Sequence, residues 1–210
     1  MKKILIWCGV SALVVTTALA DNAGALSATS KYDADLSYNS VFQKGKWELG
    51  VNAGVMFSPF FDMITHRVVD YTTTGIQGGY MLSNPMGPSW LRGNVEVIVE
   101  LFGGGVVDGK GSYVAGTIGW MRYNFLPSNG RLKPYFQLGG GVELTDIDGH
   151  LLGQRQNFNL DIGLGLRYMI TPRCAFNAEY RFQHFSDAYQ TKTNLGTNAQ
   201  GPVVGISWFF

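Results

Sequence analysis

Residues 157–170 read NFNLDIGLGLRYMI, and apolar and polar side chains alternate along this stretch. Successive side chains of a β-strand point to opposite faces of the sheet, so this alternation is typical of a strand. One face is then apolar, whereas the other carries amide, carboxylate and guanidinium groups between glycines. Residues 91–103 and 132–146 repeat the pattern. The sequence therefore predicts long strands that separate an apolar surface from a polar one.

The alternating segments are long as well as numerous. Each runs for about ten to fourteen residues, enough to cross a bilayer at a tilt, whereas strands of soluble proteins average about five or six. A membrane barrel turns its apolar face to lipid and fills a narrow lumen with polar side chains. The sequence thus predicts an all-β protein, an eight-stranded antiparallel transmembrane β-barrel of the bacterial outer membrane. The expected strands cover residues 46–57, 75–83, 91–103, 112–126, 132–146, 157–170, 174–187 and 201–210.

The connections between these segments differ in length. Some are short and contain Pro or Gly, namely 84–90, 127–131 and 171–173. Others are longer, namely 58–74, 147–156 and 188–200. Outer-membrane barrels have short periplasmic turns and longer external loops. We therefore expect the short connections in the periplasm and the long ones at the outer surface.

The N-terminal residues have the features of a secretory signal. Two lysines precede an apolar run, which ends in an Ala-Leu-Ala cleavage site at Ala20. A single transmembrane anchor is the alternative, although the apolar run is short for one. The final Phe210 resembles the signal by which such barrels contact the barrel assembly machinery. The expected organisation is a signal peptide at 1–20, a periplasmic N-terminal lead-in at 21–45 and a β-barrel domain at 46–210.

The composition narrows the functional classes. Charged residues make up 15% of the 210 residues, below the roughly one quarter usual for soluble proteins, and the formal net charge is +1. The basic residues are scattered, so no nucleic-acid surface is expected. Removal of a signal peptide would leave Cys174 as the only cysteine, which excludes an intrachain disulfide. The sequence contains no zinc-type cluster, and no metal or cofactor is predicted.

A base and a hydroxyl lie near one end of the apolar face of segment 174–187. Even-numbered residues share this face, so His184 and Ser186 follow Phe182 along it. With a periplasmic N-terminus, the seventh strand runs outward and places both side chains at the outer rim, facing the lipopolysaccharide leaflet. Serine hydrolysis needs a base close to the hydroxyl, a group that orients the base, and donors for the oxyanion. The pair predicts an esterase whose substrate comes from the lipid; a polar pair without chemistry is the alternative.

Two short stretches carry a resemblance to a known family. Residues 181–188, RFQHFSDA, and 194–198, NLGTN, resemble the signature of the PagL-type lipid A 3-O-deacylases. The resemblance implies an eight-stranded outer-membrane barrel. It also implies that His184 is the base and Ser186 the nucleophile in the release of a 3-O-linked hydroxyacyl chain from lipid A.

The sequence departs from the family pattern at two positions. Asp187 stands where the family usually has Asn, and Asn198 stands where the best-known members have Glu. An amide can orient a histidine, although it stabilises an imidazolium less well than a carboxylate does. Asn198 is therefore the expected third catalytic residue. Asp187 and Asn194 are the expected residues for the oxyanion or for substrate positioning.

Other functions stay open on the sequence alone. A small non-catalytic barrel, OmpA- or OmpX-like, would be a structural or adhesive protein in which the His–Ser pair can be replaced without consequence. A soluble periplasmic lipocalin-like carrier would turn the apolar face inward. The enzymatic interpretation predicts lipid A of lipopolysaccharide as the substrate, outer-membrane lipid as the surroundings and no nucleic acid as a partner. A homodimer is a possible assembly.

Overall fold

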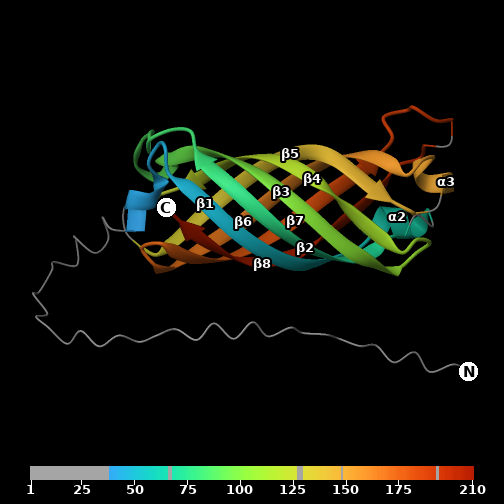
Figure 1. The fold of residues 1–210 in the computed structure, drawn as a ribbon, viewed down its shortest axis with the longest axis horizontal. Coiled ribbons are helices and arrows are strands. Elements are labelled where there is room, and N and C mark those ends of the chain that lie inside the picture. Colours follow the sequence, from blue (N-terminus) through green and yellow to red (C-terminus); the bar gives the residue numbers. More distant parts are fainter. Residues whose placement is uncertain (1–37, 66–67, 127–129, 148, 193) are drawn as a thin grey trace, which may run out of the picture.

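The computed structural model describes residues 38–210 except 66–67, 127–129, 148 and 193, and these residues form a closed β-barrel (Figure 1). Each strand pairs antiparallel with the next one in sequence, and the last pairs with the first, so the sheet has no open edge. The predicted fold class is confirmed. Within the described ranges, no helix is long and apolar enough to cross a membrane. The strands are β1 (Trp47–Met56), β2 (Asp70–Met81), β3 (Gly93–Asp108), β4 (Tyr113–Phe125), β5 (Leu132–Thr145), β6 (Gln156–Thr171), β7 (Cys174–Ser186) and β8 (Thr197–Phe209).

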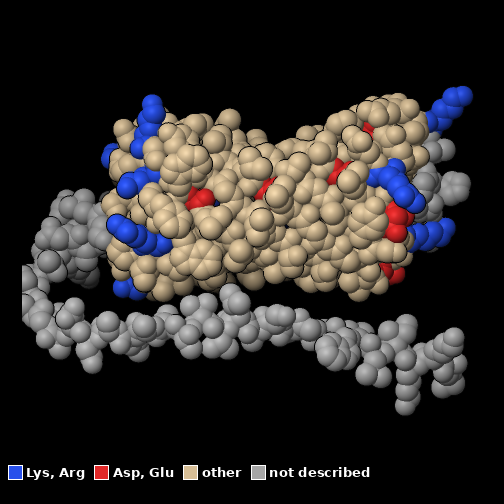
Figure 2. Space-filling view, in the orientation of Figure 1, with Lys and Arg blue, Asp and Glu red and all other residues tan. Residues whose placement is uncertain are grey.

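The apolar faces of the strands point outward. On β6, Leu160 is 66% exposed and Leu164 62% exposed, whereas the intervening Asp161 and the nearby Arg167 are buried in the lumen. The space-filling view shows Lys and Arg side chains gathered at the two ends of the barrel, with a mostly neutral surface between them (Figure 2). A soluble carrier would have the opposite arrangement. The outward apolar band is that of a barrel immersed in lipid.

Ion pairs fill the lumen near the end of the barrel at which β1 begins, which we call the inner end; the opposite end is the outer end. Glu48 accepts hydrogen bonds from Arg167 at 2.7 Å and from Ser207 at 2.6 Å, and its carboxylate also lies 3.6 Å from Arg122. These side chains come from β1, β4, β6 and β8, so the network joins strands on different sides of the barrel. Charges taken out of water in this way are stable only when they are paired and hydrogen-bonded.

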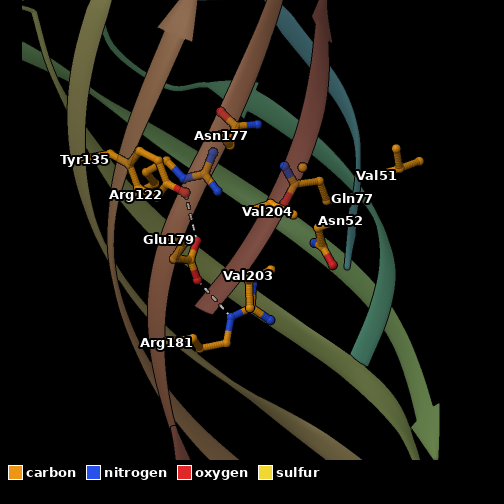
Figure 3. Close-up of a pocket in the computed structure, with 11 residues that line it drawn as sticks. Val51, Asn52, Gln77, Arg122, Tyr135, Asn177, Glu179, Arg181, Val203 and Val204 are labelled. Carbon is orange, nitrogen blue, oxygen red and sulfur yellow. Dashed lines mark hydrogen bonds and ion pairs between the residues drawn. The ribbon is translucent and has the colours of Figure 1, made fainter. Parts of the chain in front are cut away.

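The middle of the lumen is also closed by side chains (Figure 3). Arg181 bridges two carboxylates, at 2.8 Å from Glu179 and 3.1 Å from Glu100, and the Tyr135 hydroxyl donates to Glu179 at 2.9 Å. The cavity lined by these groups has a volume of about 10 Å³, which is roughly the space of one water molecule. Side chains therefore block the lumen at this level.

The two ends of the barrel have different structures (Figure 1). At one end, the 3-10 helix η1 (Ser40–Phe42) inserts the buried Phe42, whose ring lies 5.7 Å from that of Phe209. The described part of the predicted lead-in is therefore a plug for this mouth; the predicted signal peptide lies outside the described residues. The turn between β2 and β3 at the same end holds η2 (Ser89–Leu91).

The other end carries the short helices α2 (Phe60–Ile64) and α3 (Gly149–Leu152) (Figure 1). Asp146 joins two of the connections at this end, because its Oδ1 accepts the backbone N–H groups of Ser112 and Tyr113 at 2.6 and 3.1 Å. These two bonds favour the ionised form and lower the pKa of the Asp146 carboxyl. The loops at this end thus hold one another in place.

Three strands extend further toward this end than the sequence pattern predicts. β2 begins at Asp70 rather than at residue 75, β3 ends at Asp108 rather than at 103, and β8 begins at Thr197 rather than at 201. The predicted bounds were wrong because polar residues and glycines replace most aliphatic residues on the outward face here, namely Thr72 and Thr74 on β2, Gly103 and Gly105 on β3, and Asn198 and Gln200 on β8. Thr72 and Gly105, for example, exchange hydrogen bonds across β2 and β3. The extension of β8 has a functional consequence, since it brings residue 198 into the sheet.

Candidate active site

The alternation along β7 places His184 and Ser186 on the outward face of the barrel. The neighbouring Gln183 and Phe185 are buried in the lumen, whereas His184 and Ser186 are partly exposed. Ser186 is the last residue of the strand, at the end that carries α2 and α3. The two side chains therefore lie on the lipid-facing wall at its rim.

Asn198 lies directly beside His184 in the sheet. The register of β7 and β8 pairs the two residues, and His184 Nδ1 is 2.8 Å from Asn198 Oδ1. Residues paired across antiparallel strands have side chains on the same face, which explains the contact. The sequence alone also allowed Asn198 to be an ordinary loop residue. The structure brings it to the imidazole because β8 already starts at Thr197, so Asn198 belongs to the strand and not to the loop.

A further acidic residue, Asp62, reaches the same group. The backbone N–H and the side-chain Nδ2 of Asn198 both donate to Asp62 Oδ2, each at 2.9 Å. Asp62 is 0% exposed and lies on α2, in the connection between β1 and β2. Asp62 was not among the residues predicted for the site. The available signal was one carboxylate inside the apolar run Phe60-Phe61-Asp62-Met63-Ile64, where a charge without a partner is costly.

The contact with Asp62 determines the protonation pattern of the histidine. Because the amide nitrogen of Asn198 donates to Asp62, the amide oxygen faces His184 and can only accept. Nδ1 of the imidazole must then carry the hydrogen, which leaves the lone pair of Nε2 free in the neutral ring. A general base for a hydroxyl group requires this tautomer.

Ser186 and His184 form no direct hydrogen bond in the part of the chain that the structure describes. They are two residues apart on one strand face, about 6–7 Å between their Cα atoms. Catalytic hydrogen bonds are often long before substrate binds and shorten in the complex. The two side chains lie on the same face of the strand.

The connection between β7 and β8 holds the other two predicted residues. The backbone N–H of Asp187 donates to Asn194 Oδ1 at 3.3 Å, so the loop brings both together. The Asp187 carboxylate is buried and accepts hydrogen bonds from the backbone N–H and the hydroxyl of Thr191. Asp187 thus shapes the loop through its side chain, while the Asn194 oxygen is occupied and its Nδ2 is the group left for other contacts.

Gly196 borders the imidazole at the end of this loop. Its φ is +66°, a conformation that glycine adopts without strain. A Cβ at this position would lie 3.1 Å from His184 Cε1 and 3.1 Å from the Phe185 carbonyl oxygen. The N–H groups of Leu195 and Gly196 donate to the Leu151 carbonyl on α3, at 2.9 and 3.1 Å. The loop therefore approaches the His184 imidazole closely from one side.

An apolar groove begins at His184 and follows the outer wall. Its volume is about 310 Å³, and it runs over β5, β6 and β7. Most of its lining is aliphatic or aromatic, with Leu138, Leu160, Ile162 and Phe182 below the imidazole. A groove of this kind suits a hydrocarbon chain. Within the described ranges, no group of three or more His, Cys, Asp or Glu side chains is arranged to hold a metal ion.

Comparison with protein families identifies the chain. The family model described as "Lipid A 3-O-deacylase (PagL)" matches residues 99–207. The chain belongs to this family. The matched range contains all five residues that the sequence predicts for the site of this PagL-family protein. Asp62 lies outside the matched range. Comparison with curated protein sequences finds no match.

Two solved structures resemble the barrel of this PagL-family protein. The crystal structure of the outer membrane enzyme PagL has a TM-score of 0.57 at 16% identity and covers 75% of this chain and 97% of that one. Neisserial surface protein A (NspA) has a TM-score of 0.54 at 16% identity and covers 80% and 98%. At such identities the likeness shows the fold alone.

Family and fold together confirm several predictions. The protein is an enzyme of the carboxylic ester hydrolase type, a lipid A 3-O-deacylase, and it resides in the bacterial outer membrane. The family match favours this activity over a non-catalytic structural or adhesive barrel. The roles of the individual side chains are a separate question.

Proposed function

We propose that the protein removes a 3-O-linked hydroxyacyl chain from lipid A with His184 as the general base and Ser186 as the nucleophile. The observation that carries this proposal is the hydrogen bond between His184 Nδ1 and Asn198 Oδ1, which leaves Nε2 free on the lipid-facing side of the strand. Ser186 follows on the same face at the end of the strand. Asn198 is the third member, which orients the imidazole.

The reaction proceeds in two half-reactions. Nε2 of His184 takes the proton of the Ser186 hydroxyl, and Ser186 Oγ attacks the carbonyl carbon of the ester. The tetrahedral intermediate collapses, and the imidazolium returns the proton to the sugar oxygen that leaves. Water then attacks the acyl-serine with His184 again as base, which releases the hydroxy fatty acid and restores both side chains.

Donors for the oxyanion come from the loop between β7 and β8. The Asn194 oxygen accepts the Asp187 N–H, so Asn194 Nδ2 is the side-chain donor that we assign to the oxyanion. Asp187 contributes by holding the loop, because its carboxylate accepts two hydrogen bonds from Thr191. These contacts support a positioning role for Asp187, which we assign to it in place of contact with the substrate.

The location of the groove supports lipid A as the substrate. The end of the barrel with α2 and α3 is opposite the end with the short turns, and short turns of such barrels lie in the periplasm. His184 then faces the outer leaflet, where lipid A resides. The groove of about 310 Å³ below the imidazole receives the acyl chain that is cleaved. Neither an assembly-machinery contact nor a homodimer is needed for this chemistry, and both stay predictions.

The direct test is mass spectrometry of lipid A from cells that express the protein. We expect loss of one hydroxyacyl group with the native chain and intact lipid A with Ser186→Ala, because the nucleophile is absent. A matched control is Ser89→Ala, which removes an exposed hydroxyl on η2 at the opposite end of the barrel. Heat-dependent gel mobility checks that each variant is folded. Identical lipid A with the native chain and Ser186→Ala would contradict the proposal.

A further inference from the structure

Helix α2 places one buried carboxylate inside an otherwise apolar, exposed segment. Phe60 is 76% exposed and Ile64 63% exposed, whereas Asp62 between them is 0% exposed. The helix is only five residues long and begins after Pro59, whose carbonyl oxygen accepts the Asp62 N–H at 2.9 Å. The apolar side chains face outward at the rim of the barrel, and Asp62 points toward β8.

Asp62 contacts the group that orients the proposed base. Its Oδ2 accepts the backbone N–H and the Nδ2 of Asn198, each at 2.9 Å, and Asn198 Oδ1 is 2.8 Å from His184 Nδ1. Asp62 and Asn198 are 136 residues apart in the sequence, so no local turn imposes the contact. The three side chains form a continuous chain of hydrogen bonds from α2 to the imidazole.

This chain can do two things that Asn198 alone cannot. First, an isolated carboxamide can present either its oxygen or its nitrogen to an imidazole, whereas an acceptor on its far side leaves only the oxygen. The Nδ1–H tautomer of His184 is then fixed. Second, a carboxamide carries no net charge. The negative charge of a carboxylate behind it stabilises the positive imidazole that forms when the proton of Ser186 is taken.

A purely structural role for Asp62 in the connection between β1 and β2 is the alternative. This connection already has separate anchors at its base. The Ser58 N–H donates to Asp70 Oδ1 at 2.8 Å, and the Val69 N–H donates to the Ser58 hydroxyl at 2.6 Å. The carboxylate of Asp70 holds the same connection without touching Asn198. It therefore provides a matched control for Asp62.

We propose that Asp62 is a positioning residue of the active site, which acts on His184 through Asn198. The inference rests on the proposed function of the His184–Ser186 pair. It adds a residue from α2 to the catalytic group. A helix with exposed apolar side chains at the rim of the barrel then also sets the orientation of the base.

Kinetics of the purified protein on lipid A test the proposal. Asp62→Ala should lower kcat roughly 10- to 100-fold, because removal of a group that orients a catalytic side chain typically costs this much. KM should stay within about twofold, since Asp62 does not touch the acyl groove. Asp70→Ala should retain near-native kcat. Unchanged kcat in Asp62→Ala, or an equal loss in Asp70→Ala, would overturn the proposal.

An exchange of the two side chains separates orientation from general loop stability. Asn198→Asp alone places two carboxylates against each other and should lower kcat as strongly as Asp62→Ala. In the double variant Asp62→Asn with Asn198→Asp, the amide of residue 62 donates to a carboxylate that faces Nδ1. We expect kcat to recover to within about fivefold of the native enzyme. Failure of the double variant to exceed Asn198→Asp contradicts the proposal.

Nitrogen-15 NMR of the imidazole gives a readout that does not depend on activity. The native protein should show His184 as the Nδ1–H tautomer, and Asp62→Ala should show a mixture of tautomers. An unchanged tautomer in this variant overturns the inference. If the native chain does not deacylate lipid A, the proposed function fails, whereas this spectrum still tests whether Asp62 acts on His184.

Discussion

The two ends of the barrel use buried polar groups in different ways. In the inner part of the lumen, Glu48 has Arg167 at 2.7 Å and Ser207 at 2.6 Å. In the outer part, both carboxylate oxygens of Glu143 and of Asp161 lack a hydrogen-bond partner among the residues that the structure describes. Glu96 in the inner network also leaves one oxygen without a partner, but among the described residues only Glu143 and Asp161 are buried with neither carboxylate oxygen hydrogen-bonded.

The difference indicates where stability and function reside. Paired buried charges cross-link strands, and removal of one partner is costly because the other is left without compensation. Buried polar groups without partners lower stability instead. The outer end, which bears the His184–Asn198–Asp62 chain, is then the less stable end of the barrel. Three substitutions test this contrast.

The largest effect is expected for Arg167→Met in the inner network. This change leaves Glu48 buried without its closest cation, so we expect a loss of about 3–5 kcal/mol in the free energy of unfolding. Urea titration of the protein in lipid vesicles measures it. The control is Arg173→Met in the exposed turn between β6 and β7, which should unfold near the native midpoint. A native midpoint for Arg167→Met would show that the ion pairs do not stabilise the inner end.

An intermediate effect is expected for Gly196→Ala at the outer end. The added Cβ is 3.1 Å from His184 Cε1, and the positive φ is unfavourable for alanine. We expect about 1 kcal/mol of lost stability, together with a roughly tenfold lower kcat because the imidazole is displaced. Gly130→Ala, also at a positive φ but on the opposite rim, is the control for strain alone. Equal kcat in both variants would indicate that Gly196 does not act on His184.

The smallest effect, and one of opposite sign, is expected for Glu143→Met. As in the inner network, methionine replaces a buried charged residue. Here the change removes an acidic side chain that has no hydrogen-bond partner among the described residues. The variant should be as stable as the native protein or more stable by about 1 kcal/mol. Urea titration again provides the measurement. A destabilisation as large as that of Arg167→Met would remove the contrast between the two ends.

Much of the fold could be predicted from the sequence because one physical constraint acts on every strand. Each residue of a barrel wall faces either lipid or lumen, so the alternation in β6 reports its position directly. The prediction failed at the outer ends of β2, β3 and β8, where threonine, glycine or amide side chains replace the aliphatic residues of the outward face. These ends lie at the rim, and there the demand for apolar side chains is weaker.

The candidate site was only partly accessible from the sequence. His184 and Ser186 could be placed because they follow the alternation of a single strand. Their relation to Asn198 depends on the register between β7 and β8, which the loop between them sets. The lone carboxylate of Asp62 in an apolar run signals a buried partner but does not name it, because its contact with Asn198 exists only once the barrel closes and brings the connection between β1 and β2 against β8.

The side chains that close the lumen have a consequence for the path of water and products. Side chains fill the lumen around Arg181, where the remaining cavity of about 10 Å³ holds roughly one water molecule. His184 and Ser186 lie on the opposite, outward face of β7, so we expect water for the proposed hydrolysis to reach them from outside the barrel wall. With the proposed site on the lipid-facing wall, we expect the released fatty acid to leave into the membrane without passing through the barrel.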